Sequence, residues 1–226
     1  MKKLFTILAV VALATTTSFA QFSAKAGLNM ANITTNDDDA DNGMKLGLII
    51  GGNYSVEMSD NMNLDIAVTF KQSGTKQTSE SSTGGITVKS SYTVALNYLD
   101  ISPSLSYLAS DAFALSFGPY LAYAMSGNVE SEITISGGGS GIDGTTTDSE
   151  SIKFGDGDDD DGIKAMDFGI NIGATYSVSD AMSVSAGYSL GLSNLVYLDD
   201  DIDYGDDEPS LKNTGIYIAF GYTFGG

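Results

Sequence analysis

Three segments of the chain place aspartates at alternate positions, and they have the clearest ligand chemistry in the sequence. They read NDDDADNG, FGDGDDDDG and YLDDDIDYGDDEP. The alternating carboxylates are Asp37/Asp39/Asp41, Asp156/Asp158/Asp160 and Asp199/Asp201/Asp203. Calcium loops use carboxylate oxygens at this spacing. The sequence therefore predicts weak calcium binding, and we expect the ligands to be Asp156, Asp158, Asp160, Asp199 and Asp201.

None of these segments is an EF-hand loop. Counted from Asp156, the sixth position is Asp161 rather than Gly, and the twelfth is Asp167 rather than Glu. A solvated acidic rim, which keeps loops in water by charge repulsion, explains the same clusters. Both interpretations stay open at this point.

A second set of charges lies inside the segments that alternate apolar and polar residues. Each shares its face with glycines and small polar residues: Lys25, Lys45, Asp65, Lys71, Asp100 and Asp167. We expect two layers, with Lys25, Asp65 and Asp100 in one and the other three in the second. Three lysines against three aspartates suggest a neutralised network that fills an interior, since unpaired charge there is costly. The alternative is a narrow ion pathway.

Composition excludes several other functions. The chain has no His and no Cys, so the commonest general base and a frequent metal ligand are missing. No pair of carboxylates is singled out by its spacing for acid–base work, and we expect no enzymatic activity. The formal net charge is −19, which repels nucleic acid. Apart from calcium, the sequence predicts no cofactor.

The elements that position these residues are strands. In MDFGINIGATYSV (166–178) every even residue is apolar, whereas every odd residue is small or polar. A period of two is typical of a strand. The same alternation predicts eight strands, at about 22–30, 44–56, 62–70, 90–107, 112–126, 164–178, 182–196 and 212–224.

The connections between these strands are of two kinds, which alternate. Three are tight, at SDNM, LASDA and SDAM, and four are long and polar, at 34–43, 72–89, 126–163 and 196–211. Short turns at one end and long loops at the other indicate an up-and-down antiparallel barrel. We therefore predict an all-β, eight-stranded transmembrane β-barrel with short periplasmic turns and long extracellular loops.

Three features favour apolar side chains on the outside, against lipid. The polar face is rich in glycine, which leaves room inside a narrow barrel for long charged side chains. Aromatic residues gather near both ends of the apolar face, as membrane interfaces select. The turn-end girdle would comprise Phe22, Tyr54, Tyr107, Phe113, Tyr176 and Phe224, and the loop-end girdle Phe70, Tyr92, Tyr123 and Phe168. The sequence also has no second layer to cover an apolar exterior.

Two irregularities carry further predictions. In YTVALNYLDISPSLSY the apolar residues change from even to odd positions, which predicts a β-bulge between Tyr98 and Leu99. Beyond the fifth strand, apolar residues continue through Ile133 and Ile135, and Ile86 and Val88 continue the fourth. We therefore expect these two strands to project outside the bilayer as a sheet with an edge open to a partner.

The N-terminus reads as a secretory signal peptide. Lys2 and Lys3 precede an apolar run from Leu4 to Ala14, and the small-residue site SFA follows. We expect a signal peptide over 1–20 and a single barrel domain over 21–226. Export with this fold indicates a protein of the cell outer membrane.

The order of several strand patterns resembles the PorT-like outer-membrane β-barrel family of the Bacteroidetes type, a small barrel of the OmpX/OmpA kind. The patterns are AKAGLNMANI, LNYLDISPSLSY, LSFGPYLAY, MDFGINIGATY, SAGYSLGLSNL and GIYIAFGYTF. The resemblance implies a small outer-membrane barrel and no catalytic residues. The chain departs from the family at DISPSL, where proline would follow the isoleucine directly, and in ending on Gly225 and Gly226 after Phe224.

The sequence therefore favours a structural or surface-interaction role through the acidic extracellular loops. An accessory role in protein secretion or envelope assembly is the alternative, and a soluble ligand-carrying barrel is a third. We expect a monomer whose partners are outer-membrane lipid and an extracellular or envelope protein.

Overall fold

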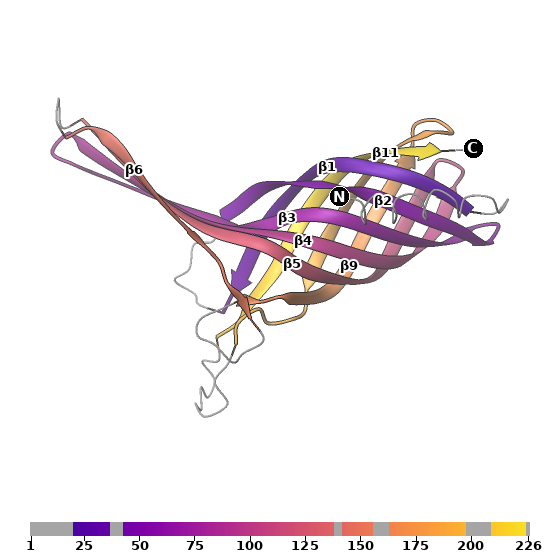
Figure 1. Ribbon diagram of the computed structural model, residues 1–226. Helices are drawn as coiled ribbons and strands as arrows, with labels where there is room; N and C mark the ends of the chain where they lie inside the picture. Colours follow the sequence, from indigo (N-terminus) through magenta and orange to yellow (C-terminus); the bar gives the residue numbers. More distant parts are fainter. Residues whose placement is uncertain (1–19, 37–42, 138–141, 156–162, 198–208, 225–226) are drawn as a thin grey trace, which may run out of the picture.

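Eight long strands form the body of the molecule (Figure 1). The computed structural model describes residues 20–36, 43–137, 142–155, 163–197 and 209–224; the expected signal peptide lies, apart from Ala20, outside them. The long strands are β1 (Ala20–Thr35), β2 (Gly43–Ser59), β3 (Met62–Thr83), β4 (Ile86–Ser110), β5 (Phe113–Ser136), β9 (Met166–Ser177), β10 (Met182–Gly191) and β11 (Leu211–Phe224). Within the described residues, no helix is long and apolar enough to cross a membrane.

These eight strands close into an antiparallel barrel. Each pairs with its neighbours along the chain, from β1 to β5 and from β9 to β11. The ring closes where β1 pairs with β11, placing Phe22 opposite Phe224, and β5 bridges to β9, placing Tyr123 opposite Met166. Three shorter strands lie in the connections: β6 (Gly144–Ser151), β7 (Phe154–Gly155) and β8 (Ile163–Lys164). The expected up-and-down barrel is confirmed.

The apolar residues of the alternating pattern point to the outside of the barrel, and the small and polar residues point to its inside. On β2, the Leu46 side chain is 64% exposed and its neighbour Gly47 is buried. On β9, Phe168 is 52% exposed and Asp167 is 1% exposed. A soluble ligand-carrying barrel would direct the large apolar residues inward, so this arrangement excludes that alternative.

The tight turns and both described chain ends lie at one end of the barrel. The turns are at residues 60–61, 111–112 and 178–181, between strands that pair directly. The turn-end girdle is formed as expected: the rings of Phe22 and Phe224 stack with centroids 5.8 Å apart, and Phe113 lies opposite Tyr176. At the loop end, Tyr92 does not belong to a girdle, because it pairs with Ser131, which lies beyond Tyr123, the residue of β5 that faces the start of β9 at Met166.

Glycine makes room for a large side chain in the lumen. At Gly187 a Cβ atom would lie 2.6 Å from the ring of Tyr217, which a real Cβ contact does not tolerate. Gly173, opposite Gly187 in the β9–β10 ladder, approaches the Tyr217 hydroxyl similarly closely. The glycines of the polar face thus fit an inward-pointing tyrosine.

The expected bulge between Tyr98 and Leu99 is not found. The pairing of β3 with β4 runs without a shift through this region, and Leu96 and Tyr98 point inward like Asp100. The irregularity lies in β5 instead: Asn97 pairs with Ser126 and Tyr98 with Ala124, so Met125 is the extra residue. The change from even to odd apolar positions has another cause, because the lumen itself becomes apolar at this level.

The expected projecting sheet is confirmed, and it is larger than predicted (Figure 1). The pairing of β2 with β3 ends at Lys76 and that of β9 with β5 at Tyr123, yet β3, β4 and β5 continue beyond both points. The segment expected as a 72–89 loop is a hairpin with a two-residue turn. Its Gly84 and Gly85 have φ of 61° and 85°, which favour glycine. β6 adds a fourth strand beside β5.

Candidate functional site

One ion pair lies at the centre of the lumen. The Lys71 Nζ atom is 3.0 Å from Asp100 Oδ2, and both side chains are buried. Lys71 also lies over the ring of Tyr120, 4.5 Å from its centroid. The sequence pattern predicts Lys71 and Asp100 in different layers. The β3–β4 register brings them together, because Asp100 pairs with Thr69, two residues from Lys71.

The other two lumen carboxylates are held by neutral donors. Asp167 accepts hydrogen bonds from Ser193 Oγ at 2.5 Å, Asn213 Nδ2 at 2.9 Å and Tyr120 Oη at 3.2 Å. Asp65 accepts hydrogen bonds from Ser55, Ser106 and Asn53. No buried side-chain polar atom in the described part of the chain lacks a hydrogen-bond partner. A buried carboxylate is stable when its oxygens are satisfied in this way.

Among the described residues, no aspartate forms an ion pair with either of the remaining two lysines. Lys25 Nζ lies 5.8 Å from the centroid of the Tyr217 ring. Lys45 is half-buried near the loop end of β2, and the described residues contain no ion pair with either lysine. Of the six expected lumen charges, the structure therefore brings two into direct contact.

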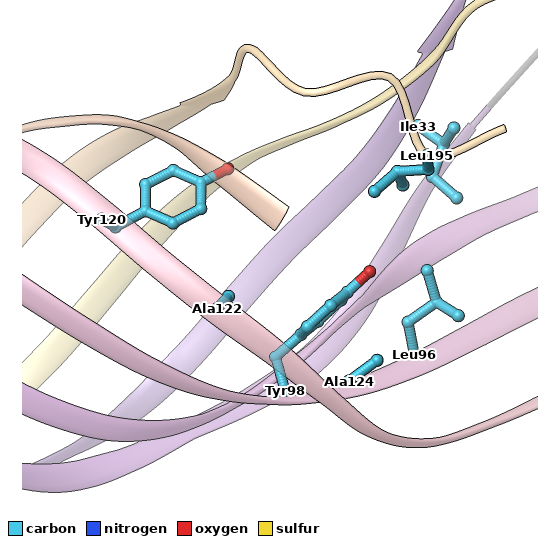
Figure 2. Packing of buried hydrophobic residues seen from close by; sticks show 7 residues of the cluster. All are labelled: Ile33, Leu96, Tyr98, Tyr120, Ala122, Ala124 and Leu195. Atoms are coloured by element: carbon cyan, nitrogen blue, oxygen red, sulfur yellow. The ribbon is translucent and has the colours of Figure 1, made fainter. Parts of the chain in front are cut away.

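Above the ion pair the lumen is closed by apolar side chains, which the sequence analysis missed. We call this group the upper plug; its buried members are Ile33, Leu96, Tyr98, Tyr120, Ala122, Ala124 and Leu195. Figure 2 shows Leu195, from the segment after β10, beside Ile33 of β1. The Tyr98 hydroxyl accepts a hydrogen bond from Asn213, 3.1 Å away. The upper lumen thus packs apolar side chains around the hydrogen-bonded Asp167 and Asn213.

The segment that supplies Leu195 was expected to be the end of a strand over 182–196. β10 instead ends at Gly191, and Leu195, four residues further on, is fully buried in the upper plug. The backbone N–H of Leu195 donates to the Leu211 carbonyl, and the Leu195 carbonyl accepts from Lys164. These bonds hold the apolar side chain over the lumen.

The projecting sheet has two different faces. Its strands lie in the order β3-β4-β5-β6. One face carries apolar side chains, among them Val88, Tyr92 and Ile133, which are between 36% and 48% exposed. The other face is polar, with Thr134 Oγ1 3.0 Å from Thr145 Oγ1 and Glu80 opposite Lys89. The apolar row on β4 and β5 is thus exposed and lies between polar side chains of β3 and β6.

The outer edges of this sheet are free of pairing among the described residues. On one side β3 is unpaired beyond Lys76, and on the other β6 pairs with β5 alone. Every residue of β6 is exposed. Because Ile152 N–H donates to the Gly127 carbonyl, the alternation of an antiparallel ladder directs the N–H groups of Thr145, Thr147 and Ser149 outward.

The expected calcium ligands Asp156, Asp158, Asp160, Asp199 and Asp201 lie outside the described residues. Within the described ranges, no group of three or more acidic side chains is placed to hold a metal ion.

A closed antiparallel barrel with an apolar outside and a filled interior is a transmembrane β-barrel. The family model for the outer membrane protein beta-barrel domain matches residues 14–197, and the chain belongs to this family. It is therefore an outer-membrane β-barrel protein. No curated protein matches it.

Several solved structures are similar over most of their length. The crystal structure of Ail, the attachment invasion locus protein of Yersinia pestis, in complex with the heparin analogue sucrose octasulfate, is 12% identical; the match covers 91% of this chain and 99% of that chain, with a TM-score of 0.41. Neisserial surface protein A is also 12% identical; the match covers 91% of this chain and 99% of that chain, with a TM-score of 0.41. CarO of Acinetobacter baumannii is 10% identical over 88% of this chain and 97% of that chain, with a TM-score of 0.35.

Proposed function

We propose that the protein is a surface-interaction protein and not a catalyst. In this proposal the barrel is an anchor, and the projecting sheet of β3, β4, β5 and β6 binds an extracellular or envelope protein. The observation that carries the proposal is the pair of free edges on that sheet. A free edge presents unpaired N–H and C=O groups, which an extended segment of another chain can complete by strand addition.

The composition of the edges favours a partner over self-association. Edges that only need protection carry proline or lysine, and neither occurs in 77–83 or 144–151. β6 carries Asp148 and Glu150, which would face the same charges on a second copy. A partner strand with Lys or Arg at alternate positions would pair with these carboxylates instead. The protein would then act as a monomer.

Site-specific cross-linking on intact cells tests this proposal. The chain has no cysteine, so Thr147→Cys provides one reactive thiol at the outer edge of β6. Ser90→Cys is the matched control, since Ser90 is exposed on β4 in the middle of the same sheet. With a short bifunctional cross-linker, we expect adducts from Thr147→Cys and none from Ser90→Cys.

A proline at position 147 provides a second test of strand addition. In Thr147→Pro the outward N–H is lost while the neighbouring bonds to β5 remain, so strand addition at this edge should fail. Adding this proline to a variant with a cysteine at Ser149 should abolish the adduct formed by that cysteine. Equal adducts from edge and centre, or adducts insensitive to proline, would contradict strand addition.

An accessory role in secretion or envelope assembly is the second proposal, and the strand patterns that resemble the PorT-like family support it. It predicts that deleting the protein causes exported proteins to accumulate in the periplasm. A surface-interaction role predicts unchanged export and loss of the cross-linked partner only.

Weak calcium binding by Asp156, Asp158, Asp160, Asp199 and Asp201 is likewise proposed, from their sequence spacing. Extracellular calcium modules bind in the range of about 10⁻⁴–10⁻³ M. Millimolar calcium should then slow proteolysis between Gly155 and Ile163, whereas sodium at equal ionic strength should not. Equal protection by both salts would mean screening of a solvated rim.

A further inference from the structure

A pocket opens on the outer wall of the barrel at its loop end. Its volume is about 570 Å³, within the range of small-molecule sites. The lining residues are Tyr123, Phe154, Gly155, Lys164, Ala165, Met166 and Tyr197. Phe154 also packs against the upper plug, but no residue of the free edges lines the pocket, so its role does not depend on the function proposed above.

The lower wall of the pocket is part of the lipid-facing surface. Tyr123 of β5 and Met166 of β9 are paired across the ladder, and their side chains are 56% and 47% exposed. Leu121 and Phe168, the next outward pair toward the turns, are 47% and 52% exposed. This continuous apolar track leads from the bilayer into the pocket, at the level where the barrel strands end.

The upper wall is a small cap, built from the parallel strands β7 and β8 and the segment that ends at Tyr197. Phe154 of β7 pairs with Ile163 of β8, and Ile163 bridges to Val196. The Tyr197 hydroxyl donates to the Gly155 carbonyl, which joins two parts of the cap. Lys164 Nζ lies 5.5 Å from the centroid of the Tyr197 ring. The cap therefore supplies one cation to a pocket that is otherwise aromatic and apolar.

From this geometry we propose that the pocket binds an anionic lipid of the outer leaflet, with its phosphate at Lys164 and the start of an acyl chain against Tyr123 and Met166. Lys ammonium groups bind phosphate, and a cation beside an apolar lining fits a lipid head group. An amphiphilic lipid can contact both the cation of the cap and the apolar lower wall, whereas a free ion would contact only the cation.

Local concentration decides between a lipid and a dissolved anion. The chain carries −19, so its field lowers the concentration of dissolved anions near the surface. A lipid arrives laterally through the bilayer, along the wall that ends at Tyr123 and Met166. The same field acts on the phosphate of a lipid, but the bilayer keeps lipid head groups at a high local concentration beside the pocket, so the membrane is the favoured source.

Native mass spectrometry of the folded full chain in micelles tests the proposal. The probes are phosphatidylglycerol and phosphatidylcholine with identical acyl chains. We expect one phosphatidylglycerol per barrel, bound about fivefold more tightly than phosphatidylcholine, which is the effect of one lysine near an anionic lipid. Lys164→Gln should abolish this preference. Lys89→Gln, the same change on the projecting sheet, should keep it.

A second pair of variants tests the apolar wall. Tyr123→Ala should weaken phosphatidylglycerol binding, and Tyr107→Ala should not, because Tyr107 is similarly exposed at the turn end and lines no part of the pocket. The folded state of each variant is checked by its mobility on unboiled gels. Equal binding of both lipids, or equal effects of Lys164→Gln and Lys89→Gln, would overturn the proposal. Displacement of the lipid by inorganic phosphate would show an anion site, and preference for phosphatidylcholine an aromatic cation site; either result overturns it.

Discussion

At the scale of single residues, the buried ion pair of Lys71 and Asp100 contributes to the free energy of unfolding of the barrel. Removing one partner of a buried pair leaves an uncompensated charge and costs about 3–5 kcal/mol. We expect Lys71→Met and Asp100→Asn each to destabilise the barrel by roughly that amount. The measurement is the fraction of faster-migrating folded protein on unboiled gels against urea concentration.

The double variant Lys71→Met/Asp100→Asn is the control for this prediction. It removes both charges and keeps the side chains at similar volume, so it should be more stable than either single variant. Equal losses in all three would mean that packing around these residues matters, and their charges do not.

Substitutions at Ile172 and Ile133 compare the cost of placing a charge in lipid with the cost of placing it in water. They are 56% and 48% exposed, but Ile172 lies midway along β9 and Ile133 in the projecting sheet. Ile172→Lys places a charge near the bilayer midplane, at a cost of about 2–4 kcal/mol. Ile133→Lys should change stability by about 0.5 kcal/mol or less, as for most surface substitutions. Unfolding in lipid vesicles provides both values, and similar losses would contradict the placement of the membrane.

Residue types predict which face a side chain occupies, but not its contact across the barrel. All six expected charges lie on strand positions of the predicted polar face. That Lys71 contacts Asp100, and Asp167 contacts Asn213 of β11, depends on the register between strands. A period of two is compatible with several registers, so these contacts could not be read from the sequence.

At the scale of elements, β6 offers a sharp test by amide exchange. The N–H groups of Thr146 and Asp148 point toward β5, whereas those of Thr145 and Thr147 point outward. We therefore expect slow exchange at Thr146 and Asp148 and fast exchange at Thr145 and Thr147 in the free protein. The hydrogen bond from Ser149 N–H to the Asp148 carboxylate belongs to the same outward set. Uniformly fast exchange across 144–151 would mean that β6 is not a stable strand.

Sequence alternation predicts strands only where the two faces meet different surroundings. The sequence predicts that β4 and β5 continue beyond the barrel, because Val88 and Ile133 remain apolar on one face. β6 was missed, because both faces of GTTTDSES are polar. The predicted bulge would place Leu96 and Tyr98 on the outside, whereas they point inward; an apolar lumen selects the same residue types as lipid.

At the scale of the whole molecule, closure of the barrel predicts resistance to detergent. All eight barrel strands are paired on both sides within the bilayer, so unfolding has no free edge there from which to begin. We expect outer-membrane fractionation and a faster-migrating band in unboiled SDS samples than in boiled ones. Recovery from the soluble periplasm with identical mobilities would contradict the membrane assignment.

The upper plug also affects the permeability of the cell envelope. The Lys71–Asp100 pair and its hydrogen-bonded neighbours fill the lower lumen, and Leu195 with its apolar neighbours covers it. The interior of an eight-stranded barrel is just wide enough for side chains to fill, and the described lumen residues fill it in this way. Under the function proposed above, a cell can raise the copy number of this protein without making its outer membrane leak, so the demand for the projecting sheet alone can set its abundance.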